Sequence, residues 1–374
     1  MSELRDIGSA FNPFGETEQP AYGPAPAPLE GKELPSFCYK LGAVKSKIFD
    51  GGTAKEANVS GFKVSDKLAG VYMTLEAGAL RELHWHANAA EWAYVIEGTA
   101  RVTTIDPNGQ AETVDFGPGD VWYFPRGHGH SIQGLGPSGC VFILVFDNGY
   151  FSEFGTFSIT DWLGHTPKDV LARNFGLPAV TFDDFPKQEV YIAKGKVPGP
   201  IPANPKPGSL NAPSLTHRYQ LLAQAPDRFA GGSMRVVSQA EFPISSTMTG
   251  ALLTINPGGM REMHWHPNAA EWQFYTKGKG RMTVFGSNGR ARTDEFGKGD
   301  VGYVPQGYGH YIENIGPDEL EMVLVLNNGT YQSISITGWM AGTPDLLLAT
   351  NFGVAEKIFA EMPQGAVVIP EKVK

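Results

Sequence analysis

The chain has 374 residues, a net charge of −9 and a pI near 5.5, so it offers no basic surface of the kind that binds nucleic acid or anionic lipid. Its 46 glycines and 28 prolines favour many short strands joined by tight turns over long helices. No stretch approaches the roughly 20 apolar residues of a membrane span. The two cysteines, Cys38 and Cys140, make no disulfide framework, and no apolar leader follows Met1, so we expect a cytoplasmic protein.

The first 35 residues are predicted to form an arm. They are rich in proline and carry no periodic apolar pattern, so they cannot build a core of their own, although they can lie across one. The first domain is expected at 36–190. Its short alternating runs are residues 71–75, 92–96, 100–105, 121–124 and 141–146, with glycine-containing turns between them. Strands of four to eight residues at this rhythm predict a sandwich or barrel.

A short helical tail is predicted to close the first domain. Thr166 would cap this helix, Pro167 would occupy its first position and Gly176 would end it. Residues 191–216 are rich in proline and glycine and predict a stiff, extended linker. The second domain is then expected at 217–362, with a C-terminal tail at 363–374.

The second half of the chain repeats the first. Four residues with metal-binding side chains recur 180 positions later (264 − 84 for the first pair). The first set is His84, His86, Glu91 and His130, and the second set is His264, His266, Glu271 and His310. A repeat of this kind predicts two copies of one domain.

One insertion breaks the symmetry of the repeat. The offset falls to 177 in the helical tails (339 − 162), whereas Gly149 and Gly329 still differ by 180, so the first copy carries extra residues between Gly149 and Trp162. They lengthen the loop at 150–156, in which Glu153 is the one carboxylate. The corresponding segment 330–333 of the second copy has none, so the longer loop is predicted to serve the first site alone.

The repeated residues have the chemistry of a metal site. On a regular strand His84 and His86 point to the same face, while Glu91 follows on the next strand and His130 comes from a separate hairpin. Three neutral imidazoles and a carboxylate, with no thiolate, suit Mn²⁺, Fe²⁺ or Ni²⁺ better than a closed structural Zn²⁺ site. On an octahedral ion they would leave two positions for substrate, water or O₂.

Arg81 and Arg261 lie three residues before the first ligand of each set. On a regular strand each would face away from the ligands and form a surface salt bridge, unless a bulge turns it inward. An inward guanidinium would bind the carboxylate of a small anionic substrate through two parallel hydrogen bonds. Trp85 and Trp265 are expected to face outward and to pack between barrels or subunits, and a redox role linking metal sites is the alternative.

The spacing of these residues resembles the two motifs of the cupin superfamily. The first motif is matched by Gly78, His84, His86, Glu91 and Gly98, and the second by Gly119, Pro125, Gly127 and His130. Residues 258–271 and 299–310 match the same motifs again. The longer strings at 81–86, 119–125 and 158–167 closely resemble the bicupin oxalate decarboxylases.

This resemblance implies an all-β fold of two tandem jelly-roll barrels with short helical tails. It further implies an enzyme, a carbon–carbon lyase that converts oxalate to formate and CO₂, with Mn²⁺ in each half and O₂ as a catalytic cofactor. Arg81, and Arg261 in the second copy, would bind the substrate and take part in catalysis. The family likeness also implies a trimer or hexamer.

In this family a Ser-Glu-Asn-Ser-Thr lid covers the N-terminal site, and its Glu handles the proton. The matching residues here are Ser152, Glu153, Phe154, Gly155 and Thr156, so the Glu is present while two positions depart from the pattern. In the second copy, Leu324 stands where some relatives carry a further Glu. The resemblance therefore places proton transfer on Glu153 and weakens the case for catalysis at the second site.

Three alternatives stay open beside the decarboxylase. The closest alternative is an oxalate oxidase, which uses the same site and reduces O₂ to hydrogen peroxide. A mobile lid, loosened by Gly155, would favour it, whereas the presence of Glu153 argues against it. A dioxygenase or isomerase for another small acid would need a larger pocket with aromatic walls. A non-catalytic storage bicupin is disfavoured, because such proteins typically lose the ligand set and both sets are intact here.

Overall fold

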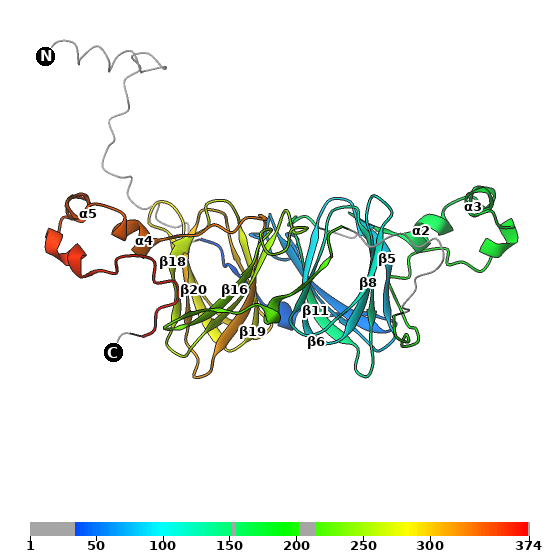
Figure 1. Ribbon diagram of the computed structural model, residues 1–374, viewed down its shortest axis with the longest axis horizontal. Coiled ribbons are helices and arrows are strands. Elements are labelled where there is room, and N and C mark those ends of the chain that lie inside the picture. The colour runs from blue at the N-terminus through cyan, green and yellow to red at the C-terminus, as the bar shows by residue number, and fades with distance from the viewer. Residues whose placement is uncertain (1–33, 152–154, 202–213, 373–374) are drawn as a thin grey trace, which may run out of the picture.

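The computed structural model describes residues 34–151, 155–201 and 214–372, and it shows two β-barrels side by side with a helical tail at each outer end (Figure 1). Most of the strands inside each sheet have alternating or continuous buried positions, because one face of each sheet lines a barrel interior. The arrangement confirms the predicted all-β fold of two tandem jelly-roll barrels with short helical tails.

The first half of the chain contains one barrel and its tail. Its elements are β1 (Cys38–Tyr39), η1 (Leu41–Ala43), β2 (Lys47–Phe49), β3 (Gly52–Ala57), β4 (Ala69–Leu75), β5 (Leu80–His86), β6 (Glu91–Gly98), β7 (Ala100–Ile105), β8 (Ala111–Phe116), β9 (Asp120–Phe124), β10 (Gly129–Gly134), β11 (Cys140–Phe146), β12 (Thr156–Ser158), α2 (Ile159–Gly164), α3 (Lys168–Phe175), η3 (Ala179–Phe182) and β13 (Ile192–Ala193).

The second half repeats this order. Its elements are β14 (Arg218–Gln220), η4 (Leu221–Ala223), β15 (Asp227–Phe229), β16 (Gly232–Val237), β17 (Thr249–Ile255), β18 (Met260–Trp265), β19 (Glu271–Lys277), β20 (Lys279–Phe285), β21 (Ala291–Gly297), β22 (Val301–Val304), β23 (Gly309–Asn314), β24 (Leu320–Leu326), β25 (Ile334–Ser335), α4 (Ile336–Ala341), α5 (Asp345–Phe352) and η5 (Glu356–Glu361).

Two antiparallel sheets form each barrel, and the halves exchange one strand. The first barrel has the sheets β14-β9-β6-β11-β4-β3-β2 and β12-β5-β10-β7-β8, with β13 added to β5. The second barrel has the sheets β1-β22-β19-β24-β17-β16-β15 and β21-β20-β23-β18-β25. Strand β1 thus pairs with β22 of the second barrel, and β14 pairs with β9 of the first. Each half of the chain therefore supplies the outermost strand of the other half's barrel.

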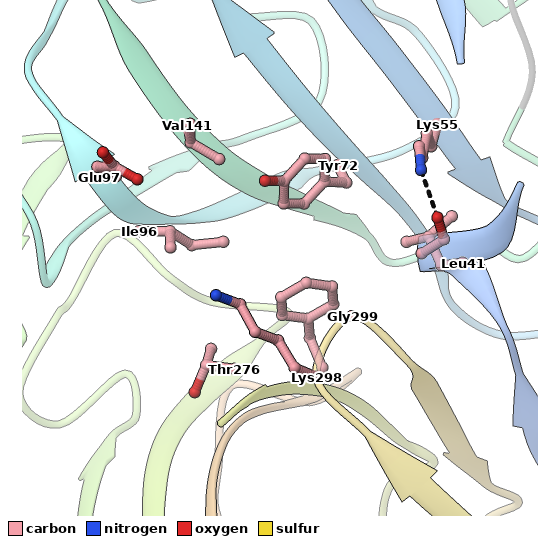
Figure 2. Close-up of a pocket in the computed structure, with 11 residues that line it drawn as sticks. Leu41, Lys55, Tyr72, Ile96, Glu97, Val141, Thr276, Lys298 and Gly299 are labelled. Carbon is pink, nitrogen blue, oxygen red and sulfur yellow. Dashed lines mark hydrogen bonds between the residues drawn. The ribbon is translucent and has the colours of Figure 1, made fainter. Parts of the chain in front are cut away.

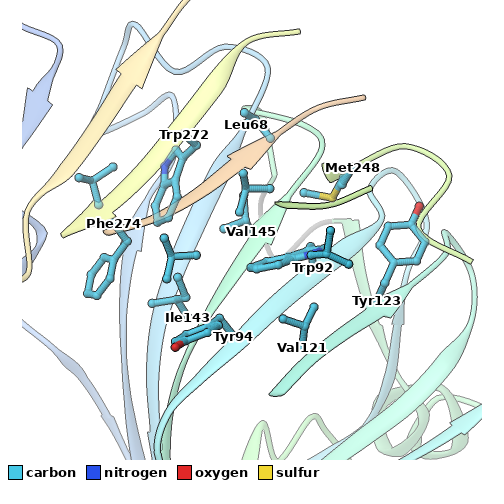
Figure 3. Packing of buried hydrophobic residues seen from close by; sticks show 14 of the residues in the cluster. Leu68, Trp92, Tyr94, Val121, Tyr123, Ile143, Val145, Met248, Trp272 and Phe274 are labelled. Atoms are coloured by element: carbon cyan, nitrogen blue, oxygen red, sulfur yellow. The ribbon is translucent and has the colours of Figure 1, made fainter. Parts of the chain in front are cut away.

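The junction of the barrels is a shared apolar core centred on two tryptophans, Trp92 and Trp272 (Figure 3). The ring of Trp272 covers Gly70, and the ring of Trp92 covers Gly250, so the contact is reciprocal. A Cβ atom on either glycine would come 2.1 Å from Cζ2 of the facing tryptophan, so a larger residue would clash. This contact fixes one barrel against the other.

The segments expected to lie outside the domains also contribute to the barrels. Within the predicted linker, β13 pairs with β5. In the predicted C-terminal tail, Ile369 is fully buried in the second core, and the carbonyl of Pro370 accepts a hydrogen bond from Met260 N. Leu34, at the end of the predicted arm, is buried in the same core. The rest of the arm, residues 1–33, and linker residues 202–213 lie outside the described residues.

The helical tail differs from its prediction in one detail. Gly176 ends α3 in the left-handed conformation, as expected, with φ 65°. Pro167, however, is the N-cap and the helix begins at Lys168, because the ψ angle of Pro167 is 135° and so not helical; the Thr166 hydroxyl donates to the carbonyl of Trp162 in α2. Across the described ranges, the helices are too short or too polar to span a membrane.

Candidate metal centres

Both predicted ligand sets come together inside the barrels. In the first barrel, β5 carries His84 and His86, β6 begins with Glu91, and β10 carries His130. The four ligand atoms of each set lie within 4.8 Å of one another, and all eight side chains are buried. In the second set, β18 carries His264, β19 begins with Glu271 and β23 carries His310, while His266 directly follows the end of β18.

Hydrogen bonds orient each imidazole of the first set. His84 Nδ1 lies 2.6 Å from the carbonyl of Glu82, and His130 Nδ1 lies 2.9 Å from the carbonyl of His128. A carbonyl only accepts, so Nδ1 carries the proton in both rings and Nε2 keeps its lone pair. His86 Nδ1 contacts Thr156 Oγ1 at 2.9 Å. These contacts aim the three Nε2 atoms at one point, as in metal-binding histidines.

The space between the ligand atoms fits a divalent ion. His86 Nε2 and Glu91 Oε2 are 3.1 Å apart, and His130 Nε2 is 3.5 Å from the same oxygen. Among the described residues, His130 Nε2 and its counterpart His310 Nε2 are buried without a hydrogen-bond partner. A buried polar atom without a partner is costly, and a metal ion at this point would bind it. The residues present therefore suit the ion that the resemblance implies.

The protonation states also favour metal binding. Burial, with the positive charge of Arg81 next in importance, holds the pKa of His84 well below its usual range, and burial lowers the pKa of His86 to about 4. Burial alone would raise the pKa of Glu91, but its interactions with His130 and His86 outweigh burial and leave that pKa below its usual range. Neutral imidazoles around an ionised carboxylate are the ligand states that a cation requires.

The second centre has the same geometry with different supporting groups. His264 Nδ1 lies 2.7 Å from the carbonyl of Glu262, and His310 Nδ1 lies 3.2 Å from that of Tyr308. His266 Nδ1 contacts the carbonyl of Gln332 at 2.6 Å, where the first centre has a threonine hydroxyl. His266 Nε2 lies 2.8 Å from Glu271 Oε2.

Two residues that the sequence analysis did not select support the ligand carboxylates. Trp122 Nε1 donates to Glu91 Oε1 over 2.8 Å, and Gln273 Nε2 donates to Glu271 Oε1 over 2.7 Å. The repeat places glycine, Gly302, where the first copy has Trp122. An alignment of the two halves of the sequence, searched for core positions at which the two copies carry different residues, could have found Trp122 and Gln273.

Arg81 points toward the first centre because β5 is bulged. His84 faces His130 on β10 and Arg81 faces Ile132, so three residues of β5 span the distance that two residues span on β10. The inward orientation that a bulge would produce is therefore the one observed, although Arg81 Nη1 also lies 3.9 Å from carboxylate oxygens of Glu82 and Glu189. Arg81 is buried and lines the same cavity as His84, His86 and Glu91 of the first set.

Tyr191 holds the guanidinium of Arg81 in place. Its carbonyl accepts a hydrogen bond from Arg81 Nη1 over 3.2 Å, and its ring lies 3.8 Å from the guanidinium carbon. Tyr191 adopts a left-handed backbone with φ 58°, which the sequence pattern did not predict. In the second barrel, Arg261 is buried in the same way, with Nη1 donating to Val368 O and Nη2 to Ser333 Oγ.

The cavity beside the first centre is small. Its volume is about 10 Å³, roughly the space that one water molecule needs. Phe146 and Phe151, stacked with ring centroids 3.7 Å apart, form part of its apolar wall. Among the described residues, a cavity of this size does not match the larger pocket that the dioxygenase or isomerase alternative would need.

The predicted lid is described in part. Ser152, Glu153 and Phe154 lie outside the described residues. Gly155 accepts a hydrogen bond from Ala87 N through its carbonyl, and a Cβ atom on it would come 2.4 Å from Asn88 Oδ1. The glycine at this departure from the family pattern is therefore tightly packed against Asn88.

Trp85 and Trp265 lie on the outer faces of β5 and β18. Trp85 stacks on Phe157 with centroids 5.5 Å apart and meets Trp162 edge-on at 5.8 Å. Trp265 meets Trp339 in the same way at 5.6 Å. Both rings thus face outward, as expected.

A separate cavity of about 360 Å³ lies between the barrels (Figure 2). Tyr72 and Phe274 face each other across it, with Lys298 at its edge. It contains none of the predicted site residues, so it has no part in the metal chemistry.

Two buried sets of three histidines and one glutamate, each inside a jelly-roll barrel, define a class of duplicated metal-binding β-barrel proteins. The chain belongs to the cupin family, because the family model described as "Cupin" matches residues 43–181 and 219–358. The assignment confirms the resemblance predicted from the two motifs.

The similar proteins include two curated relatives. The chain is 44% identical over 311 residues to "Oxalate decarboxylase OxdC" of Bacillus subtilis (strain 168), which covers 83% of this chain and 80% of the relative. It is 34% identical over 331 residues to a "Probable oxalate decarboxylase" of Arthroderma benhamiae, covering 88% and 81%.

Solved structures of the Bacillus subtilis oxalate decarboxylase have the same fold. The structure at pH 4.6 superposes with a TM-score of 0.87 and 40% identity, covering 91% of this chain and 89% of the other. A second structure, from work on the Mn(II) centres of that enzyme, gives the same TM-score and identity, covering 91% and 90%.

Proposed function

We propose that this chain is an oxalate decarboxylase, a carbon–carbon lyase that converts oxalate to formate and CO₂. One observation carries the proposal: the buried guanidinium of Arg81 lines the same small cavity as His84, His86 and Glu91, three members of a buried four-residue cluster that could hold a metal ion. Metal and guanidinium together suit a small dianion. The similarity to relatives named as oxalate decarboxylases supports the same substrate.

Manganese is the metal we assign to both centres. The donor set of nitrogen and oxygen atoms without thiolate supports this choice, as do the Mn(II) centres named for the Bacillus subtilis enzyme. A bound Mn²⁺ would supply a Lewis-acidic position for a carboxylate oxygen and, with O₂ as the catalytic cofactor, one-electron chemistry. We assign two ions per chain.

Arg81 has the task of binding and polarising the carboxylate group of oxalate that becomes formate. The ring of Tyr191 and the hydrogen bond to its carbonyl restrict the guanidinium, so little freedom is lost when substrate binds. The stacked rings of Phe146 and Phe151 keep water away from the reacting carbon. Ordered water there would compete for the proton that must return to carbon.

Glu153 has the task of moving the proton. Conversion of hydrogen oxalate to formate and CO₂ has no net redox change, so the proton that leaves a carboxyl group must be returned to carbon after CO₂ has left. One carboxylate on the longer loop can accept the proton and then deliver it. The remaining lid residues, Ser152, Phe154, Gly155 and Thr156, would position this carboxylate.

The second centre is a weaker candidate for catalysis. Arg261 would bind substrate there, supported by its hydrogen bond to Ser333 Oγ. The segment 330–333 carries no carboxylate, and Leu324 is packed into the apolar core of the second barrel. We therefore assign turnover to the first centre.

The proposal includes a homo-oligomer, a trimer or hexamer, in the cytoplasm. Large apolar side chains are exposed on the helical tails at both ends of the molecule, among them Trp162, Trp339, Leu346 and Leu347. An apolar surface of this kind is typical of a face that a partner subunit covers. The two free thiols, Cys38 and Cys140, suit a reduced compartment.

Product analysis tests the proposed reaction. Manganese-loaded protein is incubated with oxalate in air, and formate, CO₂ and hydrogen peroxide are followed together. Equal amounts of formate and CO₂ with little peroxide are expected. Peroxide with two CO₂ per oxalate would identify the oxidase instead, an alternative that the names of the relatives do not favour. No product would contradict the assignment of oxalate as substrate.

A further inference from the structure

Two imidazoles outside both metal sets meet at the edge of the first barrel. His217 precedes β14, the strand that the second half of the chain adds to this barrel, and it is buried. Its Nε2 atom lies 3.2 Å from Nδ1 of His128, which precedes β10 and is half-buried. The ring centroids are 5.4 Å apart.

A carboxylate fixes the protonation of the His217 ring. Glu112 Oε2 lies 3.1 Å from His217 Nδ1 and also accepts a hydrogen bond from the backbone N–H of His217 over 2.8 Å. Although burial favours the neutral acid, hydrogen bonds from His217 and Thr216 hold the pKa of Glu112 below its usual range. Nδ1 of His217 therefore carries a proton, and in the neutral ring Nε2 presents a lone pair toward His128. A carboxylate behind an imidazole is the usual arrangement around metal-bound histidines.

The distance between the two facing nitrogens suits a shared metal ion. Two nitrogens 3.2 Å apart, each about 2.0–2.1 Å from a zinc ion, subtend roughly 100° at the metal, close to the tetrahedral angle. The same distance is the upper end of the range for an N–H···O-type hydrogen bond. Because His128 is half-exposed, water can complete the coordination of an ion at this point.

The fold itself does not require these imidazoles. In the second barrel the equivalent positions hold Phe37, which is buried in the core, and Tyr308. In the second barrel, the exchanged strand β1 therefore packs beside the equivalent hairpin without a histidine pair. The two barrels differ at both positions, which is expected if the histidine pair gives the first barrel a function that the second lacks.

We propose that His128 and His217 form a third metal site, which binds a borderline divalent ion such as Zn²⁺ or Cu²⁺ through two imidazoles and water. Imidazole is a good ligand for both ions, and divalent copper binds most strongly among the first-row metals. Bound there, the ion joins the segment that leads into the second barrel to a hairpin of the first. The site shares no side chain with the two cupin centres, although the backbone carbonyl of His128 contacts His130, and its test does not depend on the proposed oxalate chemistry.

The first test compares metal content. Manganese-loaded protein is equilibrated with about one molar equivalent of Zn²⁺, freed of unbound metal and analysed for both elements, beside the variants His128→Tyr and His217→Phe. These variants carry the side chains of the second barrel, so the fold accommodates each at the equivalent position. Wild type should hold one zinc in addition to its manganese, and both variants should hold manganese without zinc.

The second test locates the ion. Crystals of the manganese-loaded protein soaked in Zn²⁺ should give an anomalous peak between His128 and His217 at the zinc edge, in wild type and not in His128→Tyr. Zinc found only in the cupin centres, with a matching loss of manganese, would overturn the proposal. So would equal zinc content in wild type and both variants. In either case the two rings share a hydrogen bond only.

Discussion

The indole N–H of Trp122 donates to Oε1 of the metal ligand Glu91, and in the second barrel the amide of Gln273 takes over this task for Glu271. The change of donor from Trp122 to Gln273 is accompanied by a change in the residue opposite it on the neighbouring strand. Trp122 pairs with Ala93 on β6, whereas Gln273 pairs with Gly302 on β22. A Cβ atom on Gly302 would come 2.3 Å from Gln273 Oε1, so the amide requires glycine opposite it. The two centres thus have the same ligands with different donors behind them.

Removal of either donor should weaken one centre only. Trp122→Phe leaves Glu91 Oε1 buried without its hydrogen bond, so manganese affinity at the first centre should fall about 10- to 100-fold, the usual effect of losing such a partner. Gln273→Leu should do the same at the second centre. Manganese retained per chain after dialysis against a chelator measures both. Unchanged affinity in Trp122→Phe would mean that the indole serves packing alone.

The repeat in the sequence reveals the two clusters, whereas packing between strands decides how the residues around them are oriented. The eight residues of the two buried clusters could be predicted to come together, because they recur at constant spacing and have distinctive chemistry. The inward direction of Arg81 could not, because it depends on a bulge in β5 that alternation alone leaves open. The exchange of β1 and β14 between barrels was also missed, since a strand of two or three residues has too little periodicity to reveal its partner. Trp122 and Tyr191 resemble ordinary core aromatics until their neighbours are known.

Glu153→Gln should abolish the formation of formate. The amide keeps the shape of the side chain but cannot accept and return a proton, and general acid–base catalysis contributes about 10²- to 10⁴-fold to rate. Steady-state turnover of oxalate, with manganese content measured on the same samples, checks this. The metal should stay bound because Glu153 is not among the ligands. Full activity in the variant would exclude this carboxylate from proton transfer.

Arg81→Lys should impair oxalate turnover more than the matched change Arg261→Lys. Lysine keeps the charge but loses the planar pair of donors and the stacking on Tyr191. Loss of one charged hydrogen bond costs about 1.5–3 kcal/mol, so kcat/KM should fall roughly 10- to 100-fold. The control Arg261→Lys should leave kcat/KM close to that of wild type, since we assign turnover to the first centre. Equal losses in the two variants would instead place catalysis in both barrels.

Acid should destabilise the metal-free protein in a defined window of pH. The pKa of His86 is lowered to about 4 by burial, against 6.5 for an exposed histidine, so the unfolded chain binds a proton that the folded chain does not. Stability therefore rises with pH between about 4 and 6.5 and falls as pH is lowered through this range. The lowered pKa values of His84 and Glu91 act in the same direction.

Urea unfolding of the metal-free protein between pH 4 and 7 measures this dependence. One His pKa lowered by about 2.5 pH units corresponds to roughly 3 kcal/mol between the two ends of the window. The matched variant His86→Gln has no proton to bind at this position, so its stability should change less over the same range. Because protons and metal compete for the same nitrogens, bound manganese should be released as the pH falls. Parallel pH profiles for wild type and variant would show that His86 does not control the acid sensitivity.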